Sequence, residues 1–190
     1  KAWSQVAVPH DWAIAGPFDK KWDLQMVAIE QNGEKEKTEK SGRSGALPWI
    51  GEGMYKMNLQ LPKGYKRAVL VFDGAMSQPV VKVNGKEAGR WAYGYNAFRI
   101  DITPYVKFGG KKNLVEVHLN NVEESSRWYP GGGLYRPVSV ELYGNENFST
   151  WDTFVRTLKA DRQEAEVEVN ALLEGKIGKS GKTVIALLDE

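Results

Sequence analysis

A run of three glycines between aromatic and basic residues is the part of this sequence best suited to chemistry. Residues 128–138 read WYPGGGLYRPV, and Arg127 stands directly before them. Glycine is used where φ must be positive or where the main chain must approach another group closely. Aromatic rings such as Trp128, Tyr129 and Tyr135 can cover the C–H face of a pyranose, and the flanking arginines offer donors to its hydroxyls. The run therefore indicates either sugar recognition or a tight corner that closes a β-sandwich.

The acidic and histidine side chains near expected loops occupy isolated positions. Asp11, Asp73, Glu123 and Glu124 follow this pattern, and an acid in a loop more often caps a turn or carries a solvated charge. His10 precedes Asp11 in the motif PHDW, but neighbours on a short segment usually point in different directions, which favours a packing role. We therefore assign no catalytic residue within the chain.

The composition also argues against metal and cofactor sites. With no cysteine, the chain has neither disulfides, nor thiolate metal ligands, nor a cysteine nucleophile. His118 is expected on the outward face of a strand, with no second histidine near it in the pattern. We expect no metal and no cofactor.

Charge and hydropathy exclude several classes of partner. The 190 residues carry 26 basic and 24 acidic side chains in an interleaved pattern, for a net charge of +2. This balance predicts binding neither to nucleic acid nor to an anionic membrane. The sequence has no apolar run long enough to span a bilayer and no leader before Lys1, so we expect a mature or trimmed product. The oligomeric state and the localisation stay open, with a periplasmic or secreted location favoured over a cytoplasmic one.

Short segments with a period of two dominate the sequence between residues 54 and 142. Turn residues separate them, including Asn84-Gly85, a strong hairpin signal, and no helical stripe interrupts the series. Such a pattern is typical of an antiparallel β-sandwich. The expected strands are 54–61, 68–72, 80–83, 98–102, 115–119 and 138–142.

Two segments depart from this pattern. Residues 25–45 mix charged residues with glycine and serine, which predicts a solvated surface insertion. From about residue 145 a new unit is expected, with strands at 151–157, 164–173 and 183–188. An immunoglobulin-like sandwich takes about 100 residues, so this last unit is expected to be incomplete. We therefore predict domains at 1–145 and 146–190.

Five motifs in order along the chain resemble glycoside hydrolase family 2, of the β-galactosidase type. They cover most of residues 1–145. The motifs are VPHDW at 8–12, GEGMYKMNLQLP at 51–62, FDGAMSQPVVKVNGKEAG at 72–89, YNAFRIDITPYV at 95–106 and RWYPGGGLYRPV at 127–138.

The resemblance implies an all-β chain: an N-terminal jelly-roll, galactose-binding-like "sugar-binding" domain, followed by the first strands of a truncated immunoglobulin-like domain. In that family a TIM barrel comes next and carries the two catalytic glutamates of a retaining glycosidase. No motif of that barrel occurs in this chain. The resemblance therefore implies a non-catalytic part that shapes the substrate pocket and anchors the barrel.

The resemblance also points to substrate-side residues. In the family, the loop before the glycine-rich corner and the loop before the Gly-X-Tyr strand reach toward the mouth of the barrel, and the expected partner is a β-galactoside-like carbohydrate. The sequence departs from the pattern at two positions: Pro137 stands where some β-galactosidases have an acid or amide, and Ile50 stands in place of an asparagine. The choice among galactoside, glucuronide and mannoside therefore stays open. The candidate binding residues are Arg127, Trp128, Tyr129, Trp49 and Glu52.

Two other functional classes compete with this interpretation. A free-standing carbohydrate-binding module shares the jelly roll and uses exposed tryptophans, of which the chain has seven in all. In a purely structural sandwich the same tryptophans are core or interdomain anchors. We further expect Gly132→Val to be costly through backbone strain at a positive φ, and Trp128→Ala to be mild for stability.

Overall fold

The computed structural model describes residues 3–12, 14, 27–31, 34–38, 51–121, 131–175, 178 and 181–188. In these ranges the regular structure is β-strand, with one short 3-10 helix, η2 (Thr103–Tyr105). The chain is therefore all-β, as the period-two pattern predicts.

The main body, residues 3–12, 51–63, 67–121 and 131–143, has two sheets. The larger sheet has four strands and is antiparallel throughout. Its two central strands alternate in burial, which is expected where one face of a sheet packs on a core. In spatial order the strands are β3 (Gly51–Gln60), β8 (Lys112–Asn121), β5 (Val80–Val83) and β6 (Lys86–Arg90).

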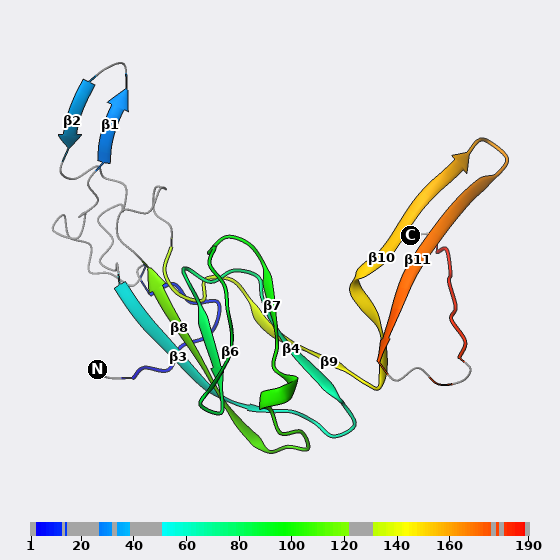
Figure 1. Ribbon diagram of the computed structural model, residues 1–190, viewed down its shortest axis with the longest axis horizontal. Helices are drawn as coiled ribbons and strands as arrows, with labels where there is room; N and C mark the ends of the chain where they lie inside the picture. Colours follow the sequence, from blue (N-terminus) through cyan, green and yellow to red (C-terminus); the bar gives the residue numbers. More distant parts are fainter. Residues whose placement is uncertain are drawn as a thin grey trace. The chain divides into compact units, whose positions relative to one another are not determined.

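The second sheet has three strands and carries the most continuously apolar sequence. Its order is β7 (Phe98–Asp101), β4 (Arg67–Phe72) and β9 (Val138–Tyr143). All five residues of β4 from Ala68 onward are buried, which agrees with the central position expected for a run of apolar residues. Figure 1 shows β4, β7 and β9 as one layer beside the layer of β3, β8, β5 and β6.

Strand β8 shows how the sequence builds the core. Every second residue from Asn113 to Asn121 is buried, and the residues between them are at least partly accessible. Val115, Val117 and Leu119 supply the apolar contacts. The two asparagines at the ends of this buried row are hydrogen-bonded through their side chains, as buried amides must be. The inward face of β8 is thus apolar in the middle and polar at both ends.

The β5–β6 hairpin turns at the dipeptide that the sequence indicates. Asn84 and Gly85 have φ of 50° and 79°, the two positive values that a two-residue type I′ turn requires. The side-chain oxygen of Asn84 also accepts a hydrogen bond of 3.0 Å from the N–H of Leu114 on β8. The turn is therefore fixed both by its own backbone and by the neighbouring strand.

The chain divides into two compact units. One unit comprises Lys1–Lys63 and Ala68–Glu141, and the other comprises Gly64–Arg67 and Leu142–Glu190. The second unit contains a long antiparallel hairpin of β10 (Glu146–Ala160) and β11 (Ala165–Gly175). A domain boundary at 145, and the jelly-roll and immunoglobulin-like topologies, stay predictions.

Two local expectations differ from the structure, and a third segment is more regular than its sequence indicates. The expected surface insertion at 25–45 contains an antiparallel hairpin of β1 (Val27–Gln31) and β2 (Glu34–Thr38). Met57, expected on the half-buried face of its strand, is 55% exposed. No strand forms over the expected range 183–188, where Leu187 is 97% exposed. An apolar alternation yields a strand only when a partner strand is present to hydrogen-bond with it.

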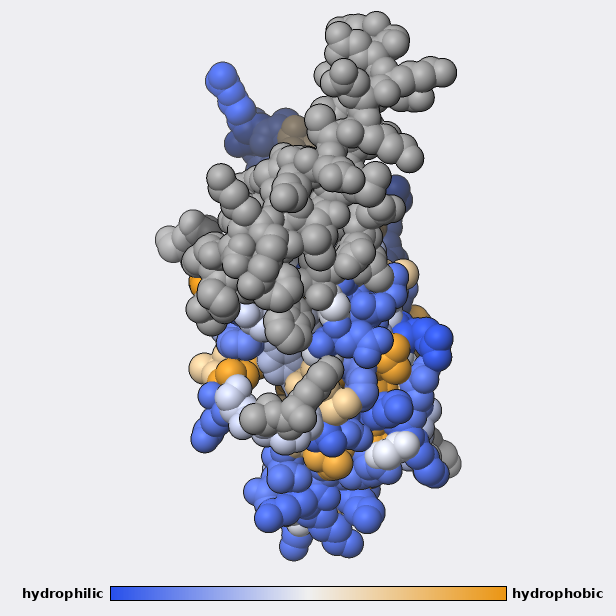
Figure 2. All heavy atoms as spheres, turned by 90° about the vertical axis from the view of Figure 1, so that its left-hand side faces the viewer, coloured by the Kyte–Doolittle hydropathy of each residue, from blue (hydrophilic) through white to orange (hydrophobic). Residues whose placement is uncertain are grey.

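The accessible surface is mixed. Figure 2 shows one face of the molecule, on which the described residues are mostly hydrophilic and the hydrophobic ones form small, separate spots. The described part of the chain contains no helix that meets the length and hydropathy needed to cross a membrane.

Candidate functional site

The glycine corner, residues 131–134, lies between two other segments of the main body. The N-terminal segment 10–12 donates two backbone hydrogen bonds to it, of 2.7 and 3.0 Å. Gly133 exchanges a pair of 3.0 Å hydrogen bonds with Met76, which follows β4. Motifs that are far apart in the sequence therefore meet at this corner.

The hydroxyl of Tyr55, on β3, joins these segments. It lies 2.8 Å from Nδ1 of His10 and 3.3 Å from the carbonyl oxygen of the same residue. It also accepts a hydrogen bond of 3.3 Å from the N–H of Leu134. The ring of His10 meets the Tyr55 ring edge-on, with centroids 5.8 Å apart. His10 therefore has the packing role that the sequence analysis favours.

The environment of Tyr55 keeps its hydroxyl protonated. Burial raises the pKa of Tyr55 to about 12, and the negative charge of Asp11 adds to the rise, while the hydrogen bond from Leu134 opposes it. A buried phenol resists ionisation because the low-dielectric surroundings disfavour its anion. At neutral pH the hydroxyl can therefore donate one hydrogen bond toward His10 while it accepts one from Leu134.

Trp12 fills the space beside the corner. Its ring stacks on Tyr55 with centroids 6.1 Å apart and planes 20° apart. A Cβ placed on Gly53 would lie 2.4 Å from the Trp12 ring, and one on Gly132 would lie 2.5 Å from its Nε1. Both glycines are needed because the indole occupies the volume that a side chain would take.

The three glycines of the corner serve two different purposes. Gly131 and Gly133 have φ of 81° and 105°, a region that L-residues rarely adopt. Gly132 is not among the residues with positive φ, so the expected backbone strain at this position is wrong. Close approach of the Trp12 ring explains Gly132 instead.

The end of β8 is tied to the same corner. Asn121, which is 4% exposed, donates a hydrogen bond of 2.8 Å from Nδ2 to the carbonyl oxygen of Gly131. Across the sheet, Asn121 is the register partner of Gly51, the first residue of β3. The start of β3, the end of β8 and the glycine corner are therefore fixed relative to one another.

Most of the expected binding residues lie outside the described ranges. This applies to Trp49, Arg127, Trp128 and Tyr129. Glu52 is described: it is exposed on β3 and pairs in register with Asn120. Sequence reasoning named the segments around the corner but missed Tyr55 as the group that joins them. The sequence feature that could have indicated Tyr55 is its position two residues after Gly53, on the inward side of a strand that begins with glycines.

The described residues hold no group of three or more histidine, cysteine, aspartate or glutamate side chains that could bind a metal.

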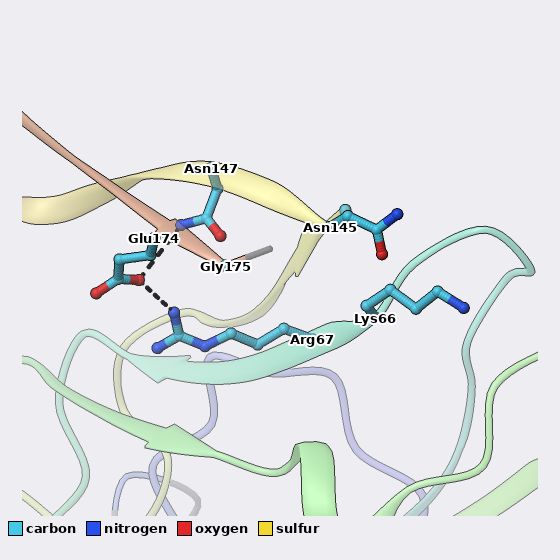
Figure 3. A pocket seen from close by; sticks show the side chains of 7 residues that line it. Lys66, Arg67, Asn145, Asn147, Glu174 and Gly175 are labelled. Carbon is cyan, nitrogen blue, oxygen red and sulfur yellow. Dashed lines mark hydrogen bonds and ion pairs between the residues drawn. The ribbon is translucent and has the colours of Figure 1, made fainter. Parts of the chain in front are cut away.

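The second unit has a pocket of its own, with a volume of about 400 Å³, and charged and amide side chains are among the residues that line it. Arg67 donates a hydrogen bond of 2.7 Å to Glu174 at its rim, and Asn147 approaches the same carboxylate oxygen at 3.4 Å. Figure 3 shows these three side chains turned toward one another, with Lys66 pointing away from them. The ion pair of Arg67 and Glu174 joins the end of β11 to Arg67 within this unit.

Comparison with known proteins gives homologues along almost the whole chain. No protein-family model matches it. The chain is 32% identical over 174 residues to the β-galactosidase BoGH2A of Bacteroides ovatus, a match that covers 90% of the chain and 18% of that protein. It is 30% identical over 177 residues to a putative β-glucuronidase of Formosa agariphila, covering 92% of the chain and 15% of the relative. The chain thus spans less than a fifth of the length of these curated relatives.

Solved structures agree with the sequence relatives. A glycosyl hydrolase family 2 member from Bacteroides cellulosilyticus superposes with a TM-score of 0.71 at 32% identity, over 90% of this chain and 21% of that one. Both the sequence and the β-sandwich architecture are therefore shared over the same extent. The chain is homologous to members of glycosyl hydrolase family 2, and it corresponds to a limited part of their length.

Proposed function

We propose that this chain is the non-catalytic N-terminal part of a retaining family 2 β-glycosidase, most closely of the β-galactosidase type, that acts in carbohydrate catabolism. In this proposal it shapes one side of the substrate pocket and anchors a downstream TIM barrel that carries the two catalytic glutamates. Retaining hydrolysis needs two carboxyl groups about 5 to 5.5 Å apart on either side of the scissile bond. In this proposal the chain itself positions the glycine corner and binds part of the carbohydrate substrate.

The arrangement of the glycine corner is the observation that carries this proposal. The corner is held by hydrogen bonds to segment 10–12, to Met76 and to Asn121. The positions of its two ends are therefore fixed. Gly51 and Asn121, which are the described residues next to the proposed binding segments, are register partners. A rigid scaffold that presents variable loops is a common basis for binding sites.

The test compares this chain with the longer protein that contains it. Both are purified and assayed on nitrophenyl β-galactoside and nitrophenyl β-glucuronide. We expect turnover by the longer protein and none by the 190-residue chain. Turnover by the short chain that survives purification and is lost in Glu52→Gln would contradict the proposal, because Glu52 is the one exposed acid among the proposed binding residues.

A second candidate function, a free-standing carbohydrate-binding module, is favoured by exposed aromatic side chains. Tyr93 is 54% exposed and Trp91 is 41% exposed, on the loop between β6 and β7. The two functions predict different affinities of the isolated chain for free galactose. If a TIM barrel must complete the pocket, the isolated chain should bind galactose in the millimolar range or more weakly, equivalent to about 4 kcal/mol or less. Micromolar binding by the isolated chain would favour the module.

A further inference from the structure

Three tyrosines and one arginine form a cluster on the surface of the main body, and none of them belongs to the proposed binding residues. We call it the tyrosine patch, and its members are Tyr93, Tyr95, Tyr135 and Arg136. The first two come from the loop between β6 and β7, and the others directly follow the glycine corner. Two segments that are about 40 residues apart in the sequence are therefore brought together.

Tyr93 is the exposed ring of the patch. It meets the partly accessible Tyr95 in a tilted contact, with centroids 5.5 Å apart and planes at 55°. Tyr93 is 54% exposed, and no hydrogen bond of its hydroxyl is found among the described residues. Exposed aromatic faces of this kind can cover the C–H side of a pyranose ring.

Arg136 supplies donors at the edge of this surface. Its guanidinium lies 5.3 Å from the centroid of the Tyr135 ring. Its Nη1 donates hydrogen bonds of 3.3 Å to the carbonyl oxygens of Asp73 and Tyr95. These bonds hold the guanidinium by one nitrogen and leave its other N–H groups available for a ligand, because the group has five donors.

The loop that carries the patch is fixed in place. The hydroxyl of Tyr135 donates a hydrogen bond of 2.9 Å to the carbonyl oxygen of Gly94. A Cβ on Gly94 would lie 2.4 Å from the sulfur of Met76, so this glycine is packed against the residue that pairs with the corner. Burial raises the pKa of Tyr135, the positive charge of Arg136 opposes the rise, and Tyr95 and Tyr93 add smaller contributions to it. A preformed surface loses little entropy on binding.

We propose that the tyrosine patch is a carbohydrate-binding surface that accepts one pyranose ring, with its C–H face on Tyr93 and its hydroxyls or carboxylate toward Arg136. The proposal takes its ligand class from the proposed function but concerns residues other than those proposed for the substrate pocket. An accessory surface of this kind keeps a second sugar unit of a chain, or a second chain, beside the enzyme.

The test is saturation-transfer NMR on the 190-residue chain with methyl β-D-galactopyranoside and, separately, methyl β-D-glucuronide. We expect transfer to the ring protons of one face of at least one probe, with millimolar affinity. Tyr93→Ala should weaken that binding roughly two- to tenfold, the range expected for one aromatic contact. Arg136→Lys, which keeps the charge but loses the fork of donors, should also weaken it.

Tyr65→Ala is the matched control, because Tyr65 is also exposed, at 39%, and belongs to the other compact unit. It should leave the affinity unchanged. Absence of transfer from both probes, or equal affinity in the wild type and Tyr93→Ala, would overturn the proposal. Since Tyr93 is largely solvent-exposed, its replacement should leave the amide spectrum of the sheets intact. Hydrolysis by the longer protein is measured separately, so either proposal can fail while the other stands.

Discussion

At the scale of single residues, the glycine corner separates two reasons for using glycine. Gly131 needs its backbone conformation, and Gly132 needs the space that Trp12 occupies. Gly133 needs both, because its φ is positive and a Cβ there would collide with the Tyr55 hydroxyl and the His10 carbonyl oxygen. These two causes respond differently to a second mutation. Only a steric cause can be relieved by trimming the neighbouring side chain.

A double-mutant cycle tests this difference. We expect Gly132→Ala to destabilise the chain by about 1 to 3 kcal/mol through overpacking, and to cost much less in a Trp12→Leu background. Gly131→Ala, with φ of 81° and no atom of Trp12 near its Cβ, should cost a similar amount in both backgrounds. Urea denaturation of the wild type, the three single mutants and the two double mutants measures the coupling. An equal cost of Gly132→Ala with and without Trp12 would contradict the steric explanation.

Tyr55 gives a prediction in pH. Its pKa is raised to about 12 by burial, above the usual value near 10. Between these two values the folded state keeps a proton that the unfolded state has lost, so stability must fall as pH rises from about 10 to 12. The stabilisation from this group is complete below pH 10.

The measurement compares the wild type with Tyr55→Phe across that pH range. The phenylalanine variant lacks the titrating hydroxyl and leaves His10 and Leu134 without their shared partner. We expect it to be less stable than the wild type at pH 8, and the difference to shrink toward pH 12. The other tyrosines are present in both proteins, so their contributions to the pH dependence cancel in the difference. A difference that stays constant with pH would show that the Tyr55 pKa is not raised.

The proposed role of Trp128 is also tested at this scale. In the 190-residue chain Trp128→Ala should have little effect on stability, whereas in the longer enzyme it should raise KM or lower kcat at near-normal stability. Thermal unfolding of the short chain and steady-state kinetics of the long one provide the two measurements. Destabilisation by about 3 to 5 kcal/mol, as for a buried aromatic, would make Trp128 a core residue instead.

At the scale of elements, the strands fall into well-buried and exposed sets. β4 and the inward face of β8 are buried, whereas almost every residue of β10 and β11 is at least partly accessible. Several large apolar side chains of that hairpin lie in solvent, including Trp151 at 78% and Phe154 at 59% exposure. Isolated two-stranded ribbons of this kind are marginally stable.

Hydrogen exchange should therefore distinguish the well-buried strands from the exposed hairpin. We expect the slowest exchange at residues 69–72 and 115–119, and faster exchange throughout β10 and β11, because local opening costs least where few apolar contacts are lost. In the longer protein we expect β10 and β11 to become protected, because further strands would cover their exposed apolar residues. Equal protection of β10 and β4 in a dilute monomer of the short chain would contradict the division.

At the scale of the whole molecule, the β-sandwich main body serves as a scaffold for the corner and the tyrosine patch. Its two sheets enclose a core in which Phe72, Val81 and Ile102 are fully buried. The homology covers this body and continues into the second unit. Because the chain spans less than a fifth of those relatives, the proposed function assigns hydrolysis to sequence outside these 190 residues.

The sequence by itself determined the elements whose cause is local. Alternation predicted β8 and β9, the continuous apolar run predicted β4, and Asn84-Gly85 predicted the β5–β6 turn. The motifs along the chain also carried the resemblance to glycoside hydrolase family 2, and the relatives found by comparison agree with it. The strands and the turn depend on neighbours within a few residues, which the sequence displays directly.

Only the tertiary structure decided what depends on distant partners. The hydroxyl of Tyr55 joins segments about 45 and 79 residues away, and no local pattern indicates such contacts. The same holds for Gly132, whose purpose depends on Trp12, and for the meeting of Tyr95 with Arg136. Residues 183–188 show the reverse case: their alternation has a local cause, but a strand also needs a hydrogen-bonding partner, and none pairs with them in the described structure.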